Sequence, residues 1–171
     1  MNRLALLFII SFASISVNAQ STLPTWFVNS CRQLKLFRQY KPVDFLNHAF
    51  IQADFNGDGK IDVAALTIEK KTGKKGIIII HAGNNQYFIL GAGSSFGNGS
   101  DDFKWARGWK IHKEKFAYKT TFDKSGDILG SRKFKLIRPA IFIYDEEDGE
   151  PNSGGIIYWN GKKYIWIHQG E

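Results

Sequence analysis

The feature that most restricts the fold of this chain is a run of four consecutive isoleucines, Ile77 to Ile80. Isoleucine is branched at Cβ and favours extended backbone, so four in a row place apolar side chains on both faces of a strand. The preceding segment from Ile61 to Glu69 is also largely apolar on both faces, and only the polar turn KKTGKKG separates the two. We therefore predict two neighbouring strands, each buried on both faces, the first of them central in its sheet.

Shorter runs of β-branched and aromatic residues, separated by glycine, asparagine and aspartate, fill most of the remaining chain. In the last of them, Asn160-Gly161 separates two such runs, which is the strongest short sequence signal for a β-hairpin. The other strands are predicted at 49–53, 87–90, 113–122, 134–137, 140–144, 155–159 and 163–168. The sequence thus predicts a mainly β fold of antiparallel strands with one N-terminal α-helix.

The predicted helix covers the segment STLPTWFVNSCRQLKLFRQYKP. Ser21 or Thr22 can cap its first turn, Pro24 suits that turn, and Pro42 ends the helix. An apolar stripe at helical spacing comprises Phe27, Cys31, Leu34 and Phe37. Because Cys31 is the only cysteine, no internal disulfide can form. Its thiol is either buried or free to pair with another chain, and its place on the stripe favours burial.

The first residues have the pattern of a secretory signal peptide. Arg3 precedes an apolar segment from Leu4 to Phe12, and Val17-Asn18-Ala19 places small residues before Gln20. We expect residues 1–19 to be removed, leaving one exported domain, residues 20–171, that is periplasmic or secreted. The alternative is a membrane anchor, although the apolar segment is short for a spanning helix. No transmembrane segment is predicted in the mature chain.

The segment DFNGDGKID has the composition of a calcium loop. Calcium takes six to eight oxygen ligands, and short loops supply them from side chains spaced two residues apart. With Asp54 at position 1, Asn56 and Asp58 occupy positions 3 and 5, the Lys60 carbonyl position 7 and Asp62 position 9. The two intervening glycines permit the tight turn. Without a cation, three carboxylates in one turn would repel one another, so an ordinary polar turn is the less favoured alternative.

These residues also resemble a known family. The segment ADFNGDGKIDVA is similar to the calcium loop of FG-GAP and VCBS repeats, the β-propeller blades of integrin α-subunits and many exported bacterial proteins. The resemblance implies calcium ligands from the side chains of Asp54, Asn56, Asp58 and Asp62 and from the Lys60 carbonyl. The loop differs from the helical calcium hand, because position 12 is Ala65 and not glutamate. Since it occurs once and propellers have several blades, we predict a single blade-like hairpin.

The chain has a net charge of +7 at pH 7. For an exported protein the anionic partners would be lipid phosphates, acidic glycans or acidic proteins, and we predict no nucleic acid partner. The lysines are scattered along the sequence, so most are expected on solvated strand faces, with a functional basic patch as the alternative. The predicted function is a non-enzymatic binding or interaction module, stabilised by one structural Ca²⁺, whose partner is an unknown protein or a cell-envelope polymer.

A small secreted hydrolase is the alternative function, with a site near the glycine-rich loop 91–102. That interpretation requires His81 or His112 to lie beside Asp101 or Asp102 in a cleft. The sequence contains no G-x-S-x-G nucleophile elbow, and the loop matches neither nucleotide-binding glycine pattern. A flat surface of aromatic residues and lysines would favour binding instead.

Two further groups of residues have open interpretations. The acidic run 145–150 is either a second cation site or a solvated loop, of which the solvated loop is favoured. The tryptophans to consider for a partner surface are Trp105, Trp109, Trp159 and Trp166. Core packing is expected for most of them. Because Tyr158 and Trp159 are adjacent in a strand, they face opposite sides, and we expect at least one to be exposed.

Overall fold

The two apolar segments form the centre of the first sheet. The computed structural model describes residues 22–170, and in it β3 (Asp62–Glu69) and β4 (Lys75–Ile80) pair antiparallel. All four isoleucines are buried, and β3 is buried on both faces over most of its length, as predicted. The other strands of this sheet are β5 (Tyr87–Gly91), which pairs with β4, and β1 (Tyr40–Pro42) and β2 (Phe50–Ala53), which pair with successive parts of β3.

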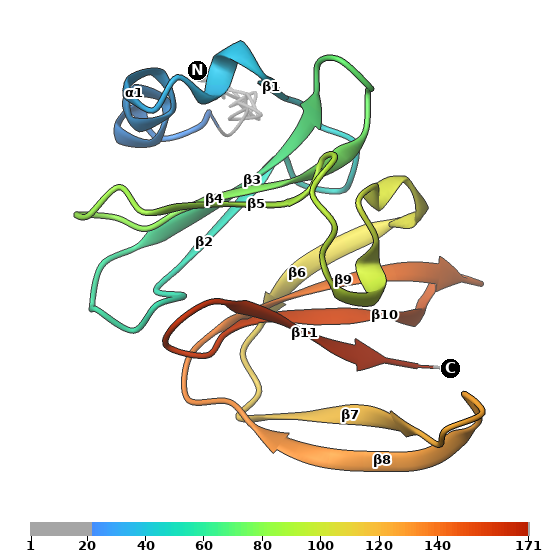
Figure 1. The fold of residues 1–171 in the computed structure, drawn as a ribbon. Helices are drawn as coiled ribbons and strands as arrows, with labels where there is room; N and C mark the ends of the chain where they lie inside the picture. Colours follow the sequence, from blue (N-terminus) through green and yellow to red (C-terminus); the bar gives the residue numbers. More distant parts are fainter. Residues whose placement is uncertain (1–21, 171) are drawn as a thin grey trace, which may run out of the picture.

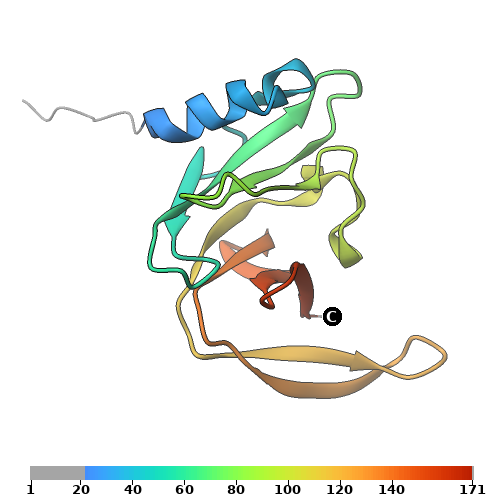
Figure 2. The same ribbon diagram turned by 60° about the vertical axis from the view of Figure 1, so that its left-hand side comes forward.

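A second sheet lies beneath the first and has the strand order β11-β10-β9-β6 (Figure 1). Its strands are β6 (Gly108–His112), β9 (Ala140–Glu147), β10 (Glu150–Trp159) and β11 (Tyr164–Gln169). The remaining strands, β7 (Phe116–Phe122) and β8 (Ile128–Lys135), form a two-stranded hairpin that projects below the second sheet (Figures 1 and 2). Every strand pair is antiparallel, and the fold is mainly β, as predicted.

Three apolar layers hold these elements together. The largest lies between the two sheets and includes Leu66, Ile79, Trp109 and Ile157. A second layer packs the N-terminal helix on the opposite face of the first sheet. The third, smaller layer lies between the second sheet and the base of the β7–β8 hairpin. The order of the layers is therefore helix, sheet, sheet and hairpin (Figure 2).

The helix is shorter than predicted. Helix α1 spans Thr25–Gln33, followed by the 3₁₀ turn η1 (Leu36–Arg38). Lys35 has a left-handed backbone with φ of 59°, which interrupts the helix, and Pro42 lies in β1 and does not end the helix. Pro24 immediately precedes the first turn, but no side chain caps it. Cys31 is buried, as expected, and burial raises the pKa of its thiol to about 12.

Other boundaries also differ from the sequence expectations. Strands β1 and β6 were not predicted, and β8 begins at Ile128, six residues before the predicted 134–137. The acidic run 145–150 is not a loop, because it forms the end of β9, a two-residue turn and the start of β10. Tyr158 and Trp159 are both buried, since both faces of β10 are covered, one by the first sheet and the other by the hairpin.

The predicted signal peptide, residues 1–19, lies outside the described residues. Within residues 22–170, no helix has the length and apolar character needed to cross a membrane.

Candidate functional site

The predicted calcium loop connects β2 to β3, and its ends are held together because Ala53 pairs with Asp62 across the two strands. Phe55, next to the first predicted ligand, is 1% exposed and belongs to the core between the sheets. Gly57 and Gly59 have φ of 81° and 84°, a left-handed backbone that other residues rarely adopt. Burial at both ends of the loop therefore presents its tip at the surface in a fixed turn.

Side-chain oxygens organise that turn. Asp54 Oδ1 accepts hydrogen bonds from the backbone N–H of Gly57 (2.6 Å) and Asp58 (3.0 Å), and its Oδ2 accepts one from Gly59 (2.9 Å). Asn56 Oδ1 accepts one from the N–H of Asp58 at 2.8 Å, and Asn56 Nδ2 donates to Asp58 Oδ2 at 3.2 Å. The structure thus brings together the side chains predicted at positions 1, 3 and 5.

Asp58 completes the exposed part of the loop. Its Oδ1 accepts a hydrogen bond from the Lys60 N–H at 2.9 Å. This bond is the main cause that lowers the pKa of Asp58, so the carboxylate is ionised at neutral pH. The oxygens of Asp54, Asn56 and Asp58 are hard ligands of the type that calcium prefers, and the exposed turn fits such an ion in the chemistry of its donors.

Asp62 occupies a different environment from the other four predicted ligands. It is fully buried, and its Oδ2 accepts hydrogen bonds from the N–H of Phe55 (3.0 Å) and Asn56 (3.2 Å). Its Oδ1 accepts a third from the N–H of Ala82 at 2.9 Å, which ties the loop to the turn after β4. Burial raises the pKa of this carboxyl, while the backbone donors and the nearby His81 oppose the rise. Asp62 therefore fastens the loop from beneath.

The five predicted ligand residues differ in how they are placed. Across residues 22–170, no group of three or more histidine, cysteine, aspartate or glutamate side chains is gathered as metal ligands. The exposed turn includes an asparagine and a backbone carbonyl among its predicted ligands, and Asp62 is bonded to backbone. The structure thus places four of the five predicted ligand residues on the exposed turn and the fifth directly below it.

Two basic side chains make contacts at the loop that the sequence did not predict, Arg138 from outside it and Lys60 from within it. The guanidinium of Arg138 packs on Gly57, where an added Cβ would come within 2.7 Å of Nε, and its Nη1 donates to the carbonyl of Trp159 at 3.3 Å. The Lys60 side chain lies against Gly83 in the neighbouring turn. The loop is therefore in contact with a basic side chain from the segment that joins β8 to β9.

His81 lies behind the loop and is fully buried. Its Nε2 is 2.9 Å from the hydroxyl of Tyr164, and its ring packs against Phe88 and Trp159. Its Nδ1 has no hydrogen-bond partner. Burial lowers the pKa of His81 in spite of the opposing charge of Asp62, so the imidazole is neutral at neutral pH. His81 is part of the packed aromatic core and is not open to a substrate.

The histidine and aspartate pairing expected for a hydrolase does not form among these residues. Asp101 pairs with Lys74, and Asp102 Oδ1 accepts hydrogen bonds from the N–H of Lys75 (3.0 Å) and Lys104 (3.1 Å). His112 Nδ1 lies 3.0 Å from a carboxylate oxygen of Glu114. Both aspartates thus anchor the glycine-rich loop to β4 and to its own backbone.

The glycine-rich loop serves to pack Trp166 of β11. Gly97 and Gly99 of the loop and Gly155 of β10 all contact the indole so closely that an added Cβ would clash with it. Beside the indole lies an open hollow of about 170 Å³, which Trp105 and His168 also line. Trp166 Nε1 and His168 Nδ1 are buried there without hydrogen-bond partners. Of the four tryptophans considered, only Trp105 and Trp166 are partly exposed.

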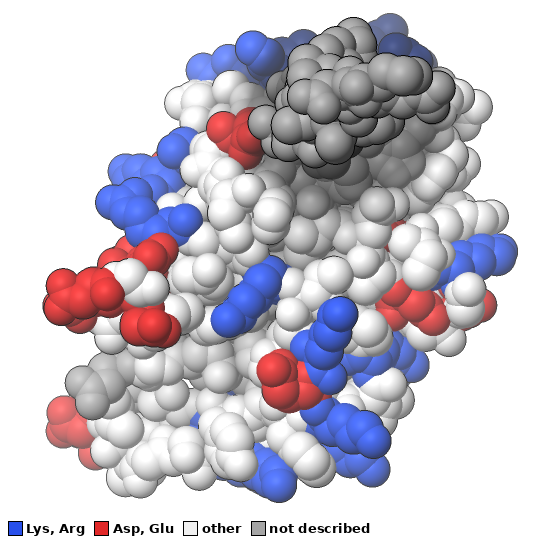
Figure 3. Space-filling view, turned by 180° about the vertical axis from the view of Figure 1, so that it is seen from behind, with Lys and Arg blue, Asp and Glu red and all other residues white. Residues whose placement is uncertain are grey.

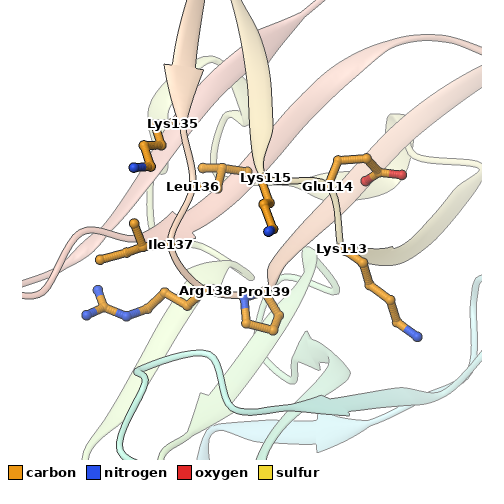
Figure 4. A pocket seen from close by; sticks show the side chains of 8 residues that line it. All are labelled: Lys113, Glu114, Lys115, Lys135, Leu136, Ile137, Arg138 and Pro139. Carbon is orange, nitrogen blue, oxygen red and sulfur yellow. The ribbon is translucent and has the colours of Figure 1, made fainter.

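A hollow of about 390 Å³ lies where the chain passes between the second sheet and the β7–β8 hairpin. It is lined by Lys113, Glu114, Lys115, Lys135, Leu136, Ile137, Arg138 and Pro139 (Figure 4). The rear view of the molecule shows one group of basic side chains at the lower right and others along the upper left (Figure 3). Three of the lysines that are scattered in sequence, Lys113, Lys115 and Lys135, are thus brought together in space around this hollow, a placement that the alternation of the strands alone did not indicate.

Comparisons with protein-family models, with characterised proteins and with solved structures find no match to this chain.

Proposed function

We propose that this protein is an exported, non-enzymatic binding module whose β2–β3 loop holds one structural calcium ion. The observation that carries the proposal is the turn in which oxygens of Asp54, Asn56 and Asp58 lie together at the surface. The Lys60 carbonyl would add a fourth ligand, and Asp62 would hold the loop from below. Calcium bound there would neutralise the carboxylates of the turn and so stabilise its closed form.

Thermal melts with calcium and with EGTA test the metal site. For a weak extracellular type of site, with a Kd of about 0.1 mM, calcium at ~1 mM would add roughly 1.4 kcal/mol to the free energy of unfolding. In a domain of this size that gain corresponds to a rise in Tm of about 3–6 °C.

A matched pair of variants makes the melt specific for the loop. Asp58→Asn should abolish the calcium-dependent rise in Tm, because it removes a ligand charge from the turn. Asp127→Asn, which changes an exposed aspartate in the β7–β8 turn, should leave the rise intact. Identical wild-type midpoints in calcium and in EGTA would show that the loop is an ordinary polar turn.

Binding is favoured over hydrolysis because the histidines and aspartates proposed for a hydrolytic site have other partners. The hollows that the structure describes are open and are lined by lysines, arginines and aromatic side chains. A pull-down from the native cell envelope, carried out with calcium and with EGTA, tests the binding role. Recovery of the same partner in both conditions would show that binding does not require calcium in the loop. Recovery of no partner in either condition would contradict the proposal of a binding module.

A further inference from the structure

The β7–β8 hairpin and its two connections carry most of the net charge of the protein. Residues 113–138 contain eight lysines and arginines against three acidic residues, a net charge of +5 out of +7 for the whole chain. This segment is less than a sixth of the sequence, so the positive charge is concentrated in one projecting element. A net charge of this density attracts anions at long range and slows their escape.

Two hollows that share Lys135 bring these cations together along the hairpin and its connections. The hollow of about 390 Å³ has four cations around it, and a second, of about 310 Å³, lies along the strands and shares Lys135 with the first. Together they are lined by the basic side chains of Lys113, Lys115, Lys119, Arg132, Lys133, Lys135 and Arg138. Among the described residues, no carboxylate forms an ion pair with any of these seven. No carboxylate among the described residues therefore neutralises these charges, although Arg138 also donates to the carbonyl of Trp159.

The three acidic residues of the segment are directed elsewhere. Glu114 extends away from Lys115 and Lys135 and contacts His112 Nδ1 at 3.0 Å (Figure 4). Asp123 and Asp127 lie at the far tip of the hairpin, where Asp123 Oδ1 accepts hydrogen bonds from the N–H groups of Ser125 and Asp127. The hollows are thus predominantly basic, with Glu114 as the one acidic residue that lines them, while the tip is acidic.

Apolar and aromatic surface accompanies the cations. Lys133 Nζ lies 3.7 Å from the centre of the Phe116 ring, and Ile137, at the edge of the larger hollow, is 69% exposed. Six of the eight large apolar side chains that residues 22–170 expose lie on this hairpin or its connections: Phe116, Tyr118, Phe122, Ile128, Leu129 and Ile137. Solvent-exposed apolar groups beside unpaired cations are typical of a surface that binds a partner.

We infer that this basic face of the β7–β8 hairpin binds a linear acidic polysaccharide. The inference rests on the proposed binding function and names the partner and its site. Two hollows that share Lys135 suit successive units of a chain, with lysines and arginines paired to its acidic groups and the exposed Ile137 against the apolar face of a sugar ring. A flat anionic bilayer fits less well, because the basic surface is concave and the tip that would enter the bilayer carries Asp123 and Asp127.

The test measures binding of short polygalacturonate fragments by calorimetry, in EGTA so that calcium neither cross-links the probe nor occupies the β2–β3 loop. The intact protein should bind the fragments, with an affinity that falls as salt rises, and should not bind neutral dextran. The triple variant Lys115→Glu, Lys133→Glu, Lys135→Glu should raise the Kd about tenfold or more, because it places like charges against the probe.

A second triple variant serves as the control. Lys35→Glu, Lys41→Glu and Lys71→Glu make the same change in net charge, but these exposed residues lie beside the helix and the first sheet, at the opposite end of the molecule (Figure 1). The control should reduce the affinity far less, and both triple variants should retain the wild-type circular dichroism spectrum. Equal losses in the two variants would contradict a site on the hairpin and indicate only a general effect of net charge.

Other anionic probes distinguish the classes of partner. Tighter binding to phosphatidylglycerol vesicles or to single-stranded DNA than to polygalacturonate would overturn the inference. So would the absence of polygalacturonate binding by a folded wild-type protein. The proposed binding function would survive that result if the envelope pull-down recovered a protein, so the two proposals can fail separately.

Discussion

The β3–β4 pair and the β7–β8 pair are both antiparallel ribbons, yet they occupy opposite environments. The first is covered by a helix on one face and by the second sheet on the other. Strand β8 is exposed along almost all of its length, and its hairpin contacts the second sheet at its base and through β7, where Thr120 Oγ1 donates to the carbonyl of Gly170 and Phe122 lies near His168. An isolated two-stranded ribbon is only marginally stable in water. The comparison indicates that the first pair maintains the fold, whereas the second is supported by the fold and presents a surface.

The largest expected effect is on core packing. Replacing the fully buried Ile79 of β4 by alanine should lower the free energy of unfolding by about 4 kcal/mol, because it removes buried methyl groups and leaves a cavity. The matched change Leu129→Ala in β8, where the side chain is 69% exposed, should change stability by less than about 0.5 kcal/mol. Urea unfolding measures both, and a comparable loss at Leu129 would show that the hairpin also belongs to the stabilising core.

The next largest effect on the free energy of unfolding is expected at Asp62, in comparison with Asp127 in the turn of the hairpin. Asp62→Ala should cost about 3 kcal/mol, because the buried carboxylate accepts backbone hydrogen bonds from Phe55, Asn56 and Ala82 that nothing else would satisfy. Asp127→Ala, in the exposed hairpin tip, should cost less than about 0.5 kcal/mol. The same urea series measures both variants in EGTA, so that calcium does not contribute. A small loss at Asp62 would mean that the loop is not fastened from beneath.

The smallest effect is on the pH dependence of stability. Burial lowers the pKa of His81 below its ordinary value of about 6.5, so the unfolded chain binds more protons than the folded protein below that pH. Its contribution to stability is therefore complete above about pH 6.5 and is lost as the pH falls, by up to about 1.4 kcal/mol per pH unit. The pKa of His168 is also lowered by burial, which adds a loss of the same sign.

Melts in EGTA between about pH 7 and pH 5 test this prediction. His81→Asn removes the titrating group and should flatten the decline in Tm, although the variant starts from a lower stability because it disturbs the contact with Tyr164. His48→Asn, a change at an exposed histidine, should leave the decline as in the wild type. An unchanged slope in His81→Asn would assign the acid sensitivity to other groups.

The candidate calcium loop was predictable from the sequence, and its energetic support was not. Alternating aspartate and asparagine with two glycines indicated the turn, and three of the predicted ligand side chains lie together in it. That Asp62 is fully buried and bonded to the turn after β4 depends on Ala82, which lies twenty residues further along the chain. Local spacing carries no information about such a partner.

The basic face of the β7–β8 hairpin also depends on contacts between residues that are distant in the sequence. The lysines are spread along the sequence, so the sequence alone predicts that most of them are exposed to solvent separately. Only the pairing of β7 with β8 and the packing of their connections place Lys115 and Lys135 around one hollow. In a similar way, the glycine-rich loop 91–102 suggested a ligand site, but its glycines are explained by close contact with Trp166.

The sequence by itself determined the mainly β class, the buried pair β3–β4 and the turn between β2 and β3. These features follow from side-chain branching, apolar runs and glycine positions, which act within a few residues. Tertiary structure decided that the helix ends before Lys35, that Tyr158 and Trp159 are both buried, and that the hairpin remains exposed with its cations together. Those outcomes depend on which faces of each strand and helix are covered by other layers. Because the covering layers come from distant parts of the chain, no single segment of the sequence determines this burial.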